Sequence, residues 1–515
     1  MSAARSYNLL CKPWIPVVWR DDAPEPKEPK VGIREALERA HEIKCISHTS
    51  PFIEFGLYRL LITIVLDAYI VAGKRPTIGK MRQMLETRKF DACLMGCYLE
   101  RHKAGFDLWG DGERFLQTAA ATSSADPVAK MVSPIPSGTK ITHWHHYSAA
   151  ETRLNEAEAA LDLCAVIPFC FDYAPADICT LAGDPPLYVI VQGESLFQAI
   201  VLNLPRPSGR TVQQAERDLG PMWRTAVSDT TAIPASPTIC QGWTWPVRKL
   251  RLSDTDRGLI FDAVNISGAG KTEARKRVRS WRDPNAGTIT EADGLFHIRG
   301  KEGMVLSRDL LPLFLIGSEG EALKGERRRS RPEVVTNALR ATDDRRLNLA
   351  LYGFIDKGGK NNKVFRSWLR SAFSFPAEVA RDERLSYQAL DAFKTAQKVA
   401  DALQVALRML RPKMAAAPRE RKNLRNSQRG ETDALAGFWQ RLEPSLARTF
   451  LDDLAEGKAD AMKNLKGVLR SEARNAFKAA ADPHRRDADG LFRIANASNY
   501  LERRLARLLP KEKNL

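Results

Sequence analysis

The distribution of proline and glycine constrains the fold of this chain more than any other feature. After about Pro376 both residues become sparse, and Ala, Leu, Arg, Lys, Asp and Glu dominate. Four amphipathic stretches with helical spacing follow: Leu385–Leu410, Asp433–Ala455 with an interruption at Pro444, Ala459–Ala480, and Ala488–Leu509. Because amphipathic helices bury their apolar faces against one another, we predict a C-terminal antiparallel four-helix bundle over residues 376–515.

The preceding 375 residues have a mixed character. Apolar residues at helical spacing predict a buried helix over Phe52–Ala72, and a short helix is expected around Ile33–Arg39. Farther along, short apolar runs alternate with proline and glycine turns. A chain of 515 residues is also too long for one typical core. The predicted fold class is therefore α+β, with a large mixed α/β domain over residues 1–375 followed by the helical bundle.

The charge balance indicates a polyanionic partner. The chain has 79 Lys and Arg against 62 Asp and Glu, a net charge of +17, which favours phosphate contacts. No apolar run reaches the roughly 18–20 residues of a membrane span, and no apolar signal core follows the N-terminus. We therefore expect a soluble, cytoplasmic protein without a membrane partner. Cys93 and Cys97, four residues apart in an apolar helical stretch, are expected to be buried thiols rather than metal ligands.

One stretch has the order of a nucleotide-binding enzyme. A strand-like segment, Leu259–Val264, precedes Asn265–Thr272, which contains the letters GAGKT, and a cationic helical stretch follows. A phosphate-binding loop requires glycine where this chain has Asn265, and no magnesium-binding aspartate is evident downstream. The favoured interpretation is a glycine turn that presents Lys271 to an anion, and a nucleotide-binding enzyme stays open as the alternative.

Other candidate chemistry is weak. His143 and His145 alternate and would share one face of a strand, but half-exposed histidines are the favoured interpretation over a metal site. Consecutive carboxylates such as Asp343 and Asp344 point apart on a helix, which suits solvated charge better than acid–base catalysis. No hydrolase or metalloprotease signature occurs. We therefore expect no catalytic residues, no cofactor and no metal, and hence no enzyme.

Two flexible segments lie beside basic residues. Ser137, Gly138 and Thr139 follow two prolines and precede a lysine, and Lys357–Lys363 (KGGKNNK) is predicted to form a hairpin-like turn. Glycine permits close approach of the backbone, and asparagine and lysine supply donors, as a reader of the DNA minor groove requires. The alternative is that both are ordinary Gly/Asn turns.

The segment Asn8–Val17, with the sequence NLLCKPWIPV, is an apolar strand entry whose two prolines suit an edge strand or an extended arm. It resembles the N-terminal signature of the CasA family, the large subunits of type I-E CRISPR surveillance complexes (Cascade). Further segments resemble that family in the same order along nearly the whole chain: Glu113–Thr118, Pro136–Thr139, Ser195–Leu204, Trp243–Leu252, and Tyr352–Gly353 followed by Lys360–Lys363 and Trp368.

The resemblance implies a non-catalytic DNA reader. Such a subunit checks the protospacer-adjacent motif (PAM) from the minor groove, wedges the duplex open, stabilises the R-loop and recruits the effector helicase–nuclease. The implied partners are the guide RNA 5′ handle, target double-stranded DNA, the other Cascade subunits and that effector. A generic basic scaffold that binds nucleic acid without reading the PAM is a further alternative.

The resemblance also assigns residues. Gly138, with Ser137 and Thr139, would approach the PAM, and a lysine contact is expected at Lys271, with Lys276 as a rival. Asn361 and Asn362, with Lys360, would form the wedge, where the family often carries glutamine and this chain has asparagine. The segment Ala119–Ser133 would meet the RNA handle.

Overall fold

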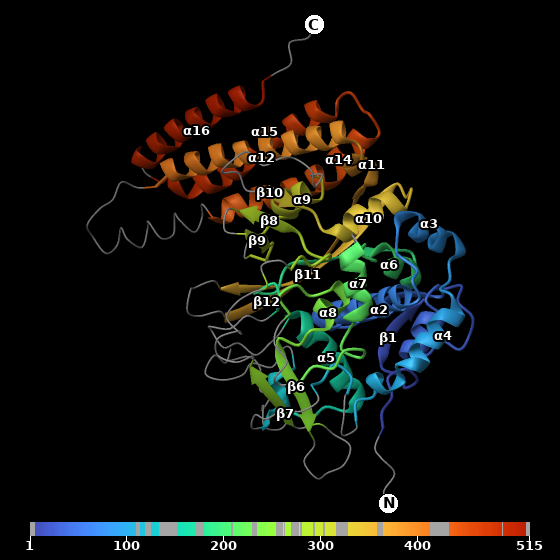
Figure 1. The fold of residues 1–515 in the computed structure, drawn as a ribbon. Coiled ribbons are helices and arrows are strands. Elements are labelled where there is room, and N and C mark those ends of the chain that lie inside the picture. Colours follow the sequence, from blue (N-terminus) through green and yellow to red (C-terminus); the bar gives the residue numbers. More distant parts are fainter. Residues whose placement is uncertain are drawn as a thin grey trace, which may run out of the picture. The chain divides into compact units, whose positions relative to one another are not determined.

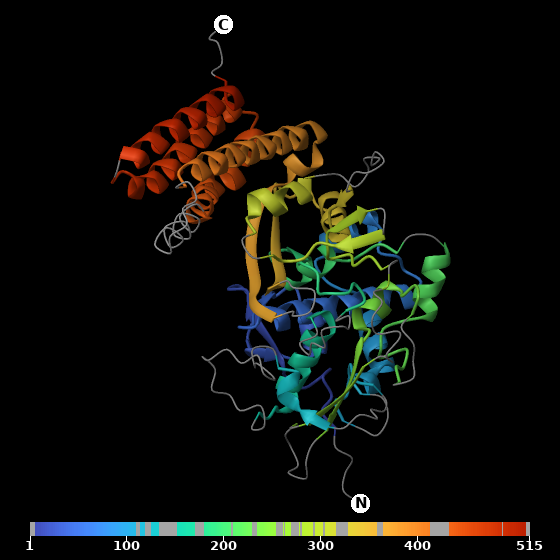
Figure 2. The same cartoon turned by 90° about the vertical axis from the view of Figure 1, so that its left-hand side faces the viewer.

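The structure is a computed structural model of the chain. It describes residues 6–109, 114–118, 125–132, 152–169, 180–207, 210–228, 234–253, 261, 263–268, 278, 281–291, 294–301, 304–315, 328–357, 364–411, 432–486 and 488–510. The chain forms two compact units: unit 1 comprises Met1–Glu302, Gly320–Asp343 and Asn348–Phe373, and unit 2 comprises Gly303–Glu319, Asp344–Leu347 and Ser374–Leu515. Small sheets and helices precede a set of C-terminal helices (Figures 1 and 2), which confirms the α+β fold class.

The core of unit 1 is built around α2 (Pro51–Val71). All of its residues except the last are buried, which confirms the buried helix predicted there. Helix α5 (Glu156–Phe169) packs against it, and the backbones approach closely at Gly56 because a Cβ there would lie 2.4 Å from the carbonyl oxygen of Cys164. The other helices of unit 1 are α1 (Ile33–Glu38, as predicted), α3 (Ile78–Thr87), α4 (Ala92–Arg101), α6 (Leu196–Leu202), α7 (Arg210–Asp218), α8 (Ile239–Thr244) and α10 (Glu333–Ala341).

Four three-stranded sheets lie among these helices, with orders β2-β1-β3, β4-β7-β6, β10-β8-β9 and β12-β11-β5. Their bounds are β1 Ile15–Trp19, β2 Lys30–Val31, β3 Ile43–Ile46, β4 Ala125–Pro127, β5 Tyr188–Gln192, β6 Arg248–Ser253, β7 Ala263–Gly268, β8 Thr288–Glu291, β9 Gly294–His297, β10 Arg328–Ser330, β11 Arg346–Lys357 and β12 Val364–Pro376. The last two strands begin or end within unit 2.

The expectation that Asn8–Val17 forms an edge strand or an extended arm is wrong. Strand β1 is the central strand of its sheet, between β2 and β3. Proline is tolerated there because Pro16 directly precedes the β1–β3 pairing, which begins at Val17 opposite Ile46, and because its carbonyl still accepts a bond from Ser47 N at 3.3 Å. Trp14 is fully buried and its indole donates to the carbonyl of Leu9 at 3.0 Å, which fixes the strand entry.

Unit 2 is helical apart from the strand residues that reach into it. Its main helices are α12 (Glu383–Met409), residues 432–444, α14 (Phe450–Ala455), α15 (Ala461–Ala481) and α16 (Ala488–Leu508), and they match the four predicted stretches closely. Helix α12 packs along both α15 and α16, as Figures 1 and 2 show. The predicted interruption at Pro444 is a π-helical turn over Ser445–Thr449, which joins residues 432–444 to α14. Proline lacks the N–H that would continue the helical bonding.

Among its described residues, unit 2 also contains shorter elements, which include a π-helical turn over Leu306–Leu310, α9 (Leu311–Leu315), α11 (Ala377–Arg381) and a 3₁₀ turn over Asp482–His484. The first two come from the middle of the chain and pack against α12. Over the described ranges of both units, no helix is both long enough and apolar enough to cross a membrane.

Candidate nucleic-acid interface

Two of the small sheets flank the segments in which the sequence predicts DNA contacts. Those contact residues all lie outside the described residues: Ser137, Gly138 and Thr139 within 133–151, Lys271 and Lys276 within 269–277, and Lys360, Asn361 and Asn362 within 358–363. The structure describes the strands and turns that flank these three segments. The observed geometry is therefore the geometry of these flanking elements.

The segment containing Gly138 leaves and returns at one end of the β4-β7-β6 sheet. Pro127, the last residue of β4, lies opposite Ala263, the first residue of β7. On the return, Leu154 and Phe261 exchange two backbone hydrogen bonds of 2.9 and 2.8 Å. Phe261 is fully buried and stacks on Trp109, with ring centroids 4.3 Å apart. The base of this segment is therefore closed by paired backbone and a packed aromatic residue.

The segment containing Lys271 directly follows β7. The bounds of β7 differ from those of the strand that was predicted to precede a nucleotide-binding loop. The strand begins at Ala263 and runs to Gly268, so it lies four residues later than the strand predicted over Leu259–Val264. Asn265 lies opposite Arg251, and Gly268 lies opposite Arg248. Backbone in a sheet ladder is not free to wrap around a phosphate, so Asn265–Gly268, the first half of the candidate loop Asn265–Thr272, is sheet rather than phosphate-binding loop.

The predicted wedge lies between β11 and β12, which are neighbours in one sheet. Lys357 ends β11 and Val364 begins β12, so six residues connect the two strands. A connection of this length joins antiparallel neighbours, since parallel strands need a crossover of a dozen residues or more. The flanking strands thus have the arrangement that the predicted hairpin-like turn requires.

The base of this hairpin is tied to the start of α2 by a buried carboxylate. Glu54 accepts a hydrogen bond of 2.6 Å from the Tyr352 hydroxyl on β11. The Arg370 guanidinium on β12 lies 2.9 Å from the same carboxylate. Burial raises the pKa of Glu54, and the Tyr352 hydrogen bond and the Arg370 charge oppose that shift. Both strands are therefore held at one helix terminus by a charged pair and a hydroxyl.

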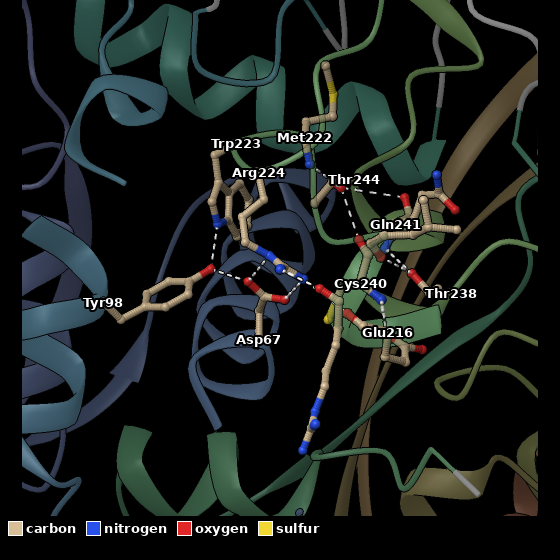
Figure 3. A network of polar contacts seen from close by, with 12 residues as sticks. Asp67, Tyr98, Glu216, Met222, Trp223, Arg224, Thr238, Cys240, Gln241 and Thr244 are labelled. Carbon is tan, nitrogen blue, oxygen red and sulfur yellow. Dashed lines mark hydrogen bonds and ion pairs between the residues drawn. The ribbon is translucent and has the colours of Figure 1, made fainter. Parts of the chain in front are cut away.

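A buried polar cluster that sequence reasoning missed lies in unit 1 (Figure 3). Arg224 contacts both oxygens of Asp67 at 2.8 Å, and the Tyr98 hydroxyl donates to the same carboxylate. Trp223 completes the cluster by donating its indole N–H to the Tyr98 oxygen at 2.7 Å. Burial raises the pKa of Tyr98 well above its ordinary value, so the phenol stays protonated as a donor.

The same network continues to the start of α8. Arg224 donates to the backbone carbonyls of Arg217 and Glu216 at 2.8 and 3.0 Å. The Glu216 carboxylate in turn accepts the backbone N–H groups of Ile239 and Cys240, and burial raises its pKa to about 7. The cluster thus links α2, α4, α7 and α8, and its polar groups form hydrogen bonds and an ion pair within the fold. No motif could have revealed it, because Asp67 and Arg224 are 157 residues apart.

The predicted burial of Cys93 and Cys97 is wrong, since both thiols are exposed on α4. They lie on the solvent face because Met95, Tyr98 and Leu99 supply the buried face of that helix. The histidine cluster at 143–146 lies outside the described residues. Of the segment Ala119–Ser133 predicted to meet the RNA handle, residues 125–132 are described, as β4 and a 3₁₀ turn over Val128–Lys130. Within the described ranges, no three His, Cys, Asp or Glu side chains gather in a metal-like group.

Comparison with known proteins finds relatives of this chain in both sequence and fold. Residues 8–480 match the family described as CRISPR-associated protein Cse1. The CRISPR-associated protein CasA/Cse1 of Thermus thermophilus is 25% identical in an alignment of 507 residues that covers 93% of each chain. A crystal structure of Thermus thermophilus CasA superposes with a TM-score of 0.74 at 19% identity, covering 98% of this chain and 100% of that one. A chain of a CRISPR RNA-guided surveillance complex superposes with a TM-score of 0.71 at 18% identity, covering 98% and 99%.

The fold is thus that of the CasA/Cse1 class of CRISPR-associated proteins. The family match covers residues 8–480 and therefore shows more than a shared fold. This chain belongs to the Cse1 (CasA) family. The family resemblance inferred from the ordered sequence motifs is confirmed.

Proposed function

We propose that this chain is the non-catalytic large subunit of a type I-E CRISPR RNA-guided surveillance complex, Cascade. The observation that carries the proposal is family membership over residues 8–480. The net charge of +17 supports nucleic-acid partners. The proposed partners are the guide RNA 5′ handle, target double-stranded DNA, the other Cascade subunits and the effector helicase–nuclease, and the proposed compartment is the cytoplasm.

PAM reading is assigned to the segment with Ser137, Gly138 and Thr139 and to Lys271, with Lys276 as the rival lysine. The closed base formed by Leu154 and Phe261 supports this assignment, because a glycine loop on a fixed base can hold its backbone donors against a groove. The minor groove carries a degenerate pattern of donors and acceptors. A reader of this kind is expected to tolerate several related PAM sequences.

Strand separation is assigned to Lys360, Asn361 and Asn362. The anchoring of β11 and β12 on Glu54 supports a rigid wedge. Unstacking a base step costs a few kcal/mol. Exchange of a DNA duplex for an RNA–DNA hybrid is nearly balanced in free energy, so the protein that opens the first base pairs decides whether the exchange starts. Basic surface then stabilises the displaced strand.

Neither alternative gains support from a specific observation. The nucleotide-binding enzyme needs a phosphate loop where β7 forms ladder pairs with β6. The generic basic scaffold has the same charge but predicts DNA affinity that ignores PAM sequence. The distinction between a PAM reader and a scaffold therefore rests on binding measurements.

The test is a duplex-binding titration of the guide-RNA complex, reconstituted with and without this chain, on targets with intact and scrambled PAM. We expect tight binding only with the chain and the intact PAM, and a loss of at least tenfold for Gly138→Asp. Gly79→Asp is the matched control, because an added Cβ there meets nothing within 4 Å. Binding that ignores the PAM, or that survives Gly138→Asp, would overturn the PAM assignment.

The wedge is tested separately with Asn361→Ala/Asn362→Ala. A fluorescent base analogue next to the PAM reports opening of the first base pairs. We expect slower opening with unchanged assembly of the complex. The exposed pair on α16, Asn496→Ala/Asn499→Ala, serves as the control. Equal opening rates for the two double variants would remove the wedge from residues 360–362.

A further inference from the structure

Strand β12 carries two exposed side chains suited to single-stranded nucleic acid. Trp368 is 43% exposed, which is unusual for so large an apolar side chain. Arg370 lies two residues farther along, and its side chain is 52% exposed. Residues i and i+2 of a strand face the same side, roughly 7 Å apart. The indole and the guanidinium therefore form one composite surface at an edge strand of the β12-β11-β5 sheet.

The indole is held in place without being covered. Its ring packs against Phe52 of α2 in an edge-to-face arrangement, with centroids 6.2 Å apart and planes at 84°. Such a pair fixes the ring orientation at little conformational cost. A fixed, partly exposed aromatic ring is the element on which single-stranded bases stack in proteins that bind them.

The surroundings add fixed positive charge. Arg370 is held by Glu54, which is itself buried, so its guanidinium stays at one place on the surface. An aromatic face beside a fixed guanidinium is complementary to a base and its phosphate, whereas a protein partner would favour a broader apolar patch.

We propose that Trp368 is a stacking platform for an unpaired nucleobase of the target DNA, and that Arg370 contacts the adjacent phosphate. The proposal rests on the proposed function, since the opened duplex supplies the single strand. Trp368 lies five residues from Lys363, the last residue of the β11–β12 connection. At about 3.3 Å per residue this is about 17 Å along the strand. At about 3.4 Å per stacked nucleotide, the base in question lies within about five nucleotides of the first opened pair.

The experiment uses the reconstituted guide-RNA complex and target duplexes with a single 5-iodouracil at successive positions near the PAM. Irradiation is expected to cross-link Trp368 at one or two neighbouring positions of one strand, as mapped by mass spectrometry. Trp368→Ala is expected to weaken R-loop formation by about 5- to 100-fold. Trp368→Phe, which keeps a ring, should retain most of it, and Trp368→Leu, which keeps only apolar packing, should not.

The control is Phe492→Ala on α16, another exposed aromatic residue, which should leave R-loop formation unchanged. PAM-dependent binding by the wild type, with equal R-loop formation for Trp368→Ala and no cross-link, would overturn this proposal alone. Absence of PAM-dependent binding by the wild type would overturn the proposed function as well. Failure of Trp368→Leu and Trp368→Ala to enter the complex, with Trp368→Phe normal, would assign the surface to a protein subunit and overturn the stacking role.

Discussion

Unit 1 contains ion pairs that are almost completely buried, whereas the described ion pairs of unit 2 are all at least partly exposed. In unit 1, Arg59 and Asp283 meet at 2.8 Å with side chains only 5% and 2% exposed. In unit 2, Arg474 and Glu502 meet at 2.6 Å with side chains 52% and 45% exposed. A buried charge depends on its partner, whereas a surface pair contributes little to folding. Unit 1 therefore adds specific buried polar pairs to its apolar core, whereas the described ion pairs of unit 2 contribute little beside its apolar helix faces.

The distribution of charge along the sequence agrees with this contrast. Residues 376–515 carry 28 Lys and Arg against 19 Asp and Glu, so more than half of the net charge of +17 falls in the C-terminal 140 residues. Since surface pairs there add little to stability, that excess is available to an external polyanion. The two regions should consequently respond to different kinds of substitution.

The largest expected effect is Arg59→Met in unit 1. The change leaves Asp283 buried without its ion-pair partner and removes a guanidinium that lies 4.6 Å from the Phe55 ring centroid. Breaking such a pair costs about 3–5 kcal/mol of unfolding free energy, to be measured by chemical denaturation. The double variant Arg59→Met/Asp283→Asn should recover part of the loss. A loss below about 1 kcal/mol for the single variant would break the comparison.

A slightly smaller effect is expected for Leu469→Ala in unit 2. Leu469 is fully buried on α15, and truncation removes apolar contact and leaves a cavity. The expected loss is about 2–4 kcal/mol. Lys463→Ala on the exposed side of the same helix should change stability by less than about 0.5 kcal/mol. Similar losses for the two variants would show that the apolar face of α15 does not carry the stability of unit 2.

The third prediction concerns pH and unit 1. Burial raises the pKa of Asp162 on α5 to about 8, with the Glu158 charge adding to the shift. Between its ordinary pKa of 3.8 and about 8, the unfolded chain has lost this proton and the folded chain retains it. Stability should therefore fall as pH rises through that window. Between pH 5 and pH 8 the fall should exceed about 1 kcal/mol, and Asp162→Asn should reduce it. Parallel stability–pH curves for wild type and variant would contradict this.

The smallest effect is expected for the surface pair of unit 2. Arg474→Gln and Glu502→Gln should each cost less than about 1 kcal/mol, and 1 M salt should reduce the difference from wild type. Thermal unfolding of the two single variants and the double variant gives the coupling energy of the pair. A coupling above about 2 kcal/mol would give unit 2 the same dependence on polar partners as unit 1.

The predictability of the fold follows the same division. The helices of unit 2 were predictable because helical periodicity is a local signal, and even the interruption at Pro444 appeared in the sequence. Strand β7 was displaced by four residues because its extent depends on pairing with β6 and β4, which are distant in sequence. The central position of β1 was missed for the same reason: proline predicts an edge strand unless it is known where the pairing with the neighbouring strand begins.

The candidate interface was predictable only through family resemblance. Gly138 and Asn361 belong to segments whose sequence chemistry is also that of ordinary loops. Their supports, the Leu154–Phe261 pairing and the Glu54 anchor of β11 and β12, join residues more than a hundred positions apart. Exposure of Trp368 could not be inferred from a strand that is rich in apolar residues. Such features depend on tertiary contacts that one sequence does not display.

The way the chain contributes to unit 2 has a consequence for how this protein can be divided. Unit 2 takes Gly303–Glu319 and Asp344–Leu347 from the middle of the sequence in addition to its C-terminal stretch. The Ser307 hydroxyl donates to Glu443 at 2.6 Å, and α9 packs against α12. A gene fragment that begins near residue 376 would therefore encode helices without part of the surface on which they fold. Recombination between relatives could exchange this bundle as a working module only if the two internal segments were inherited with it.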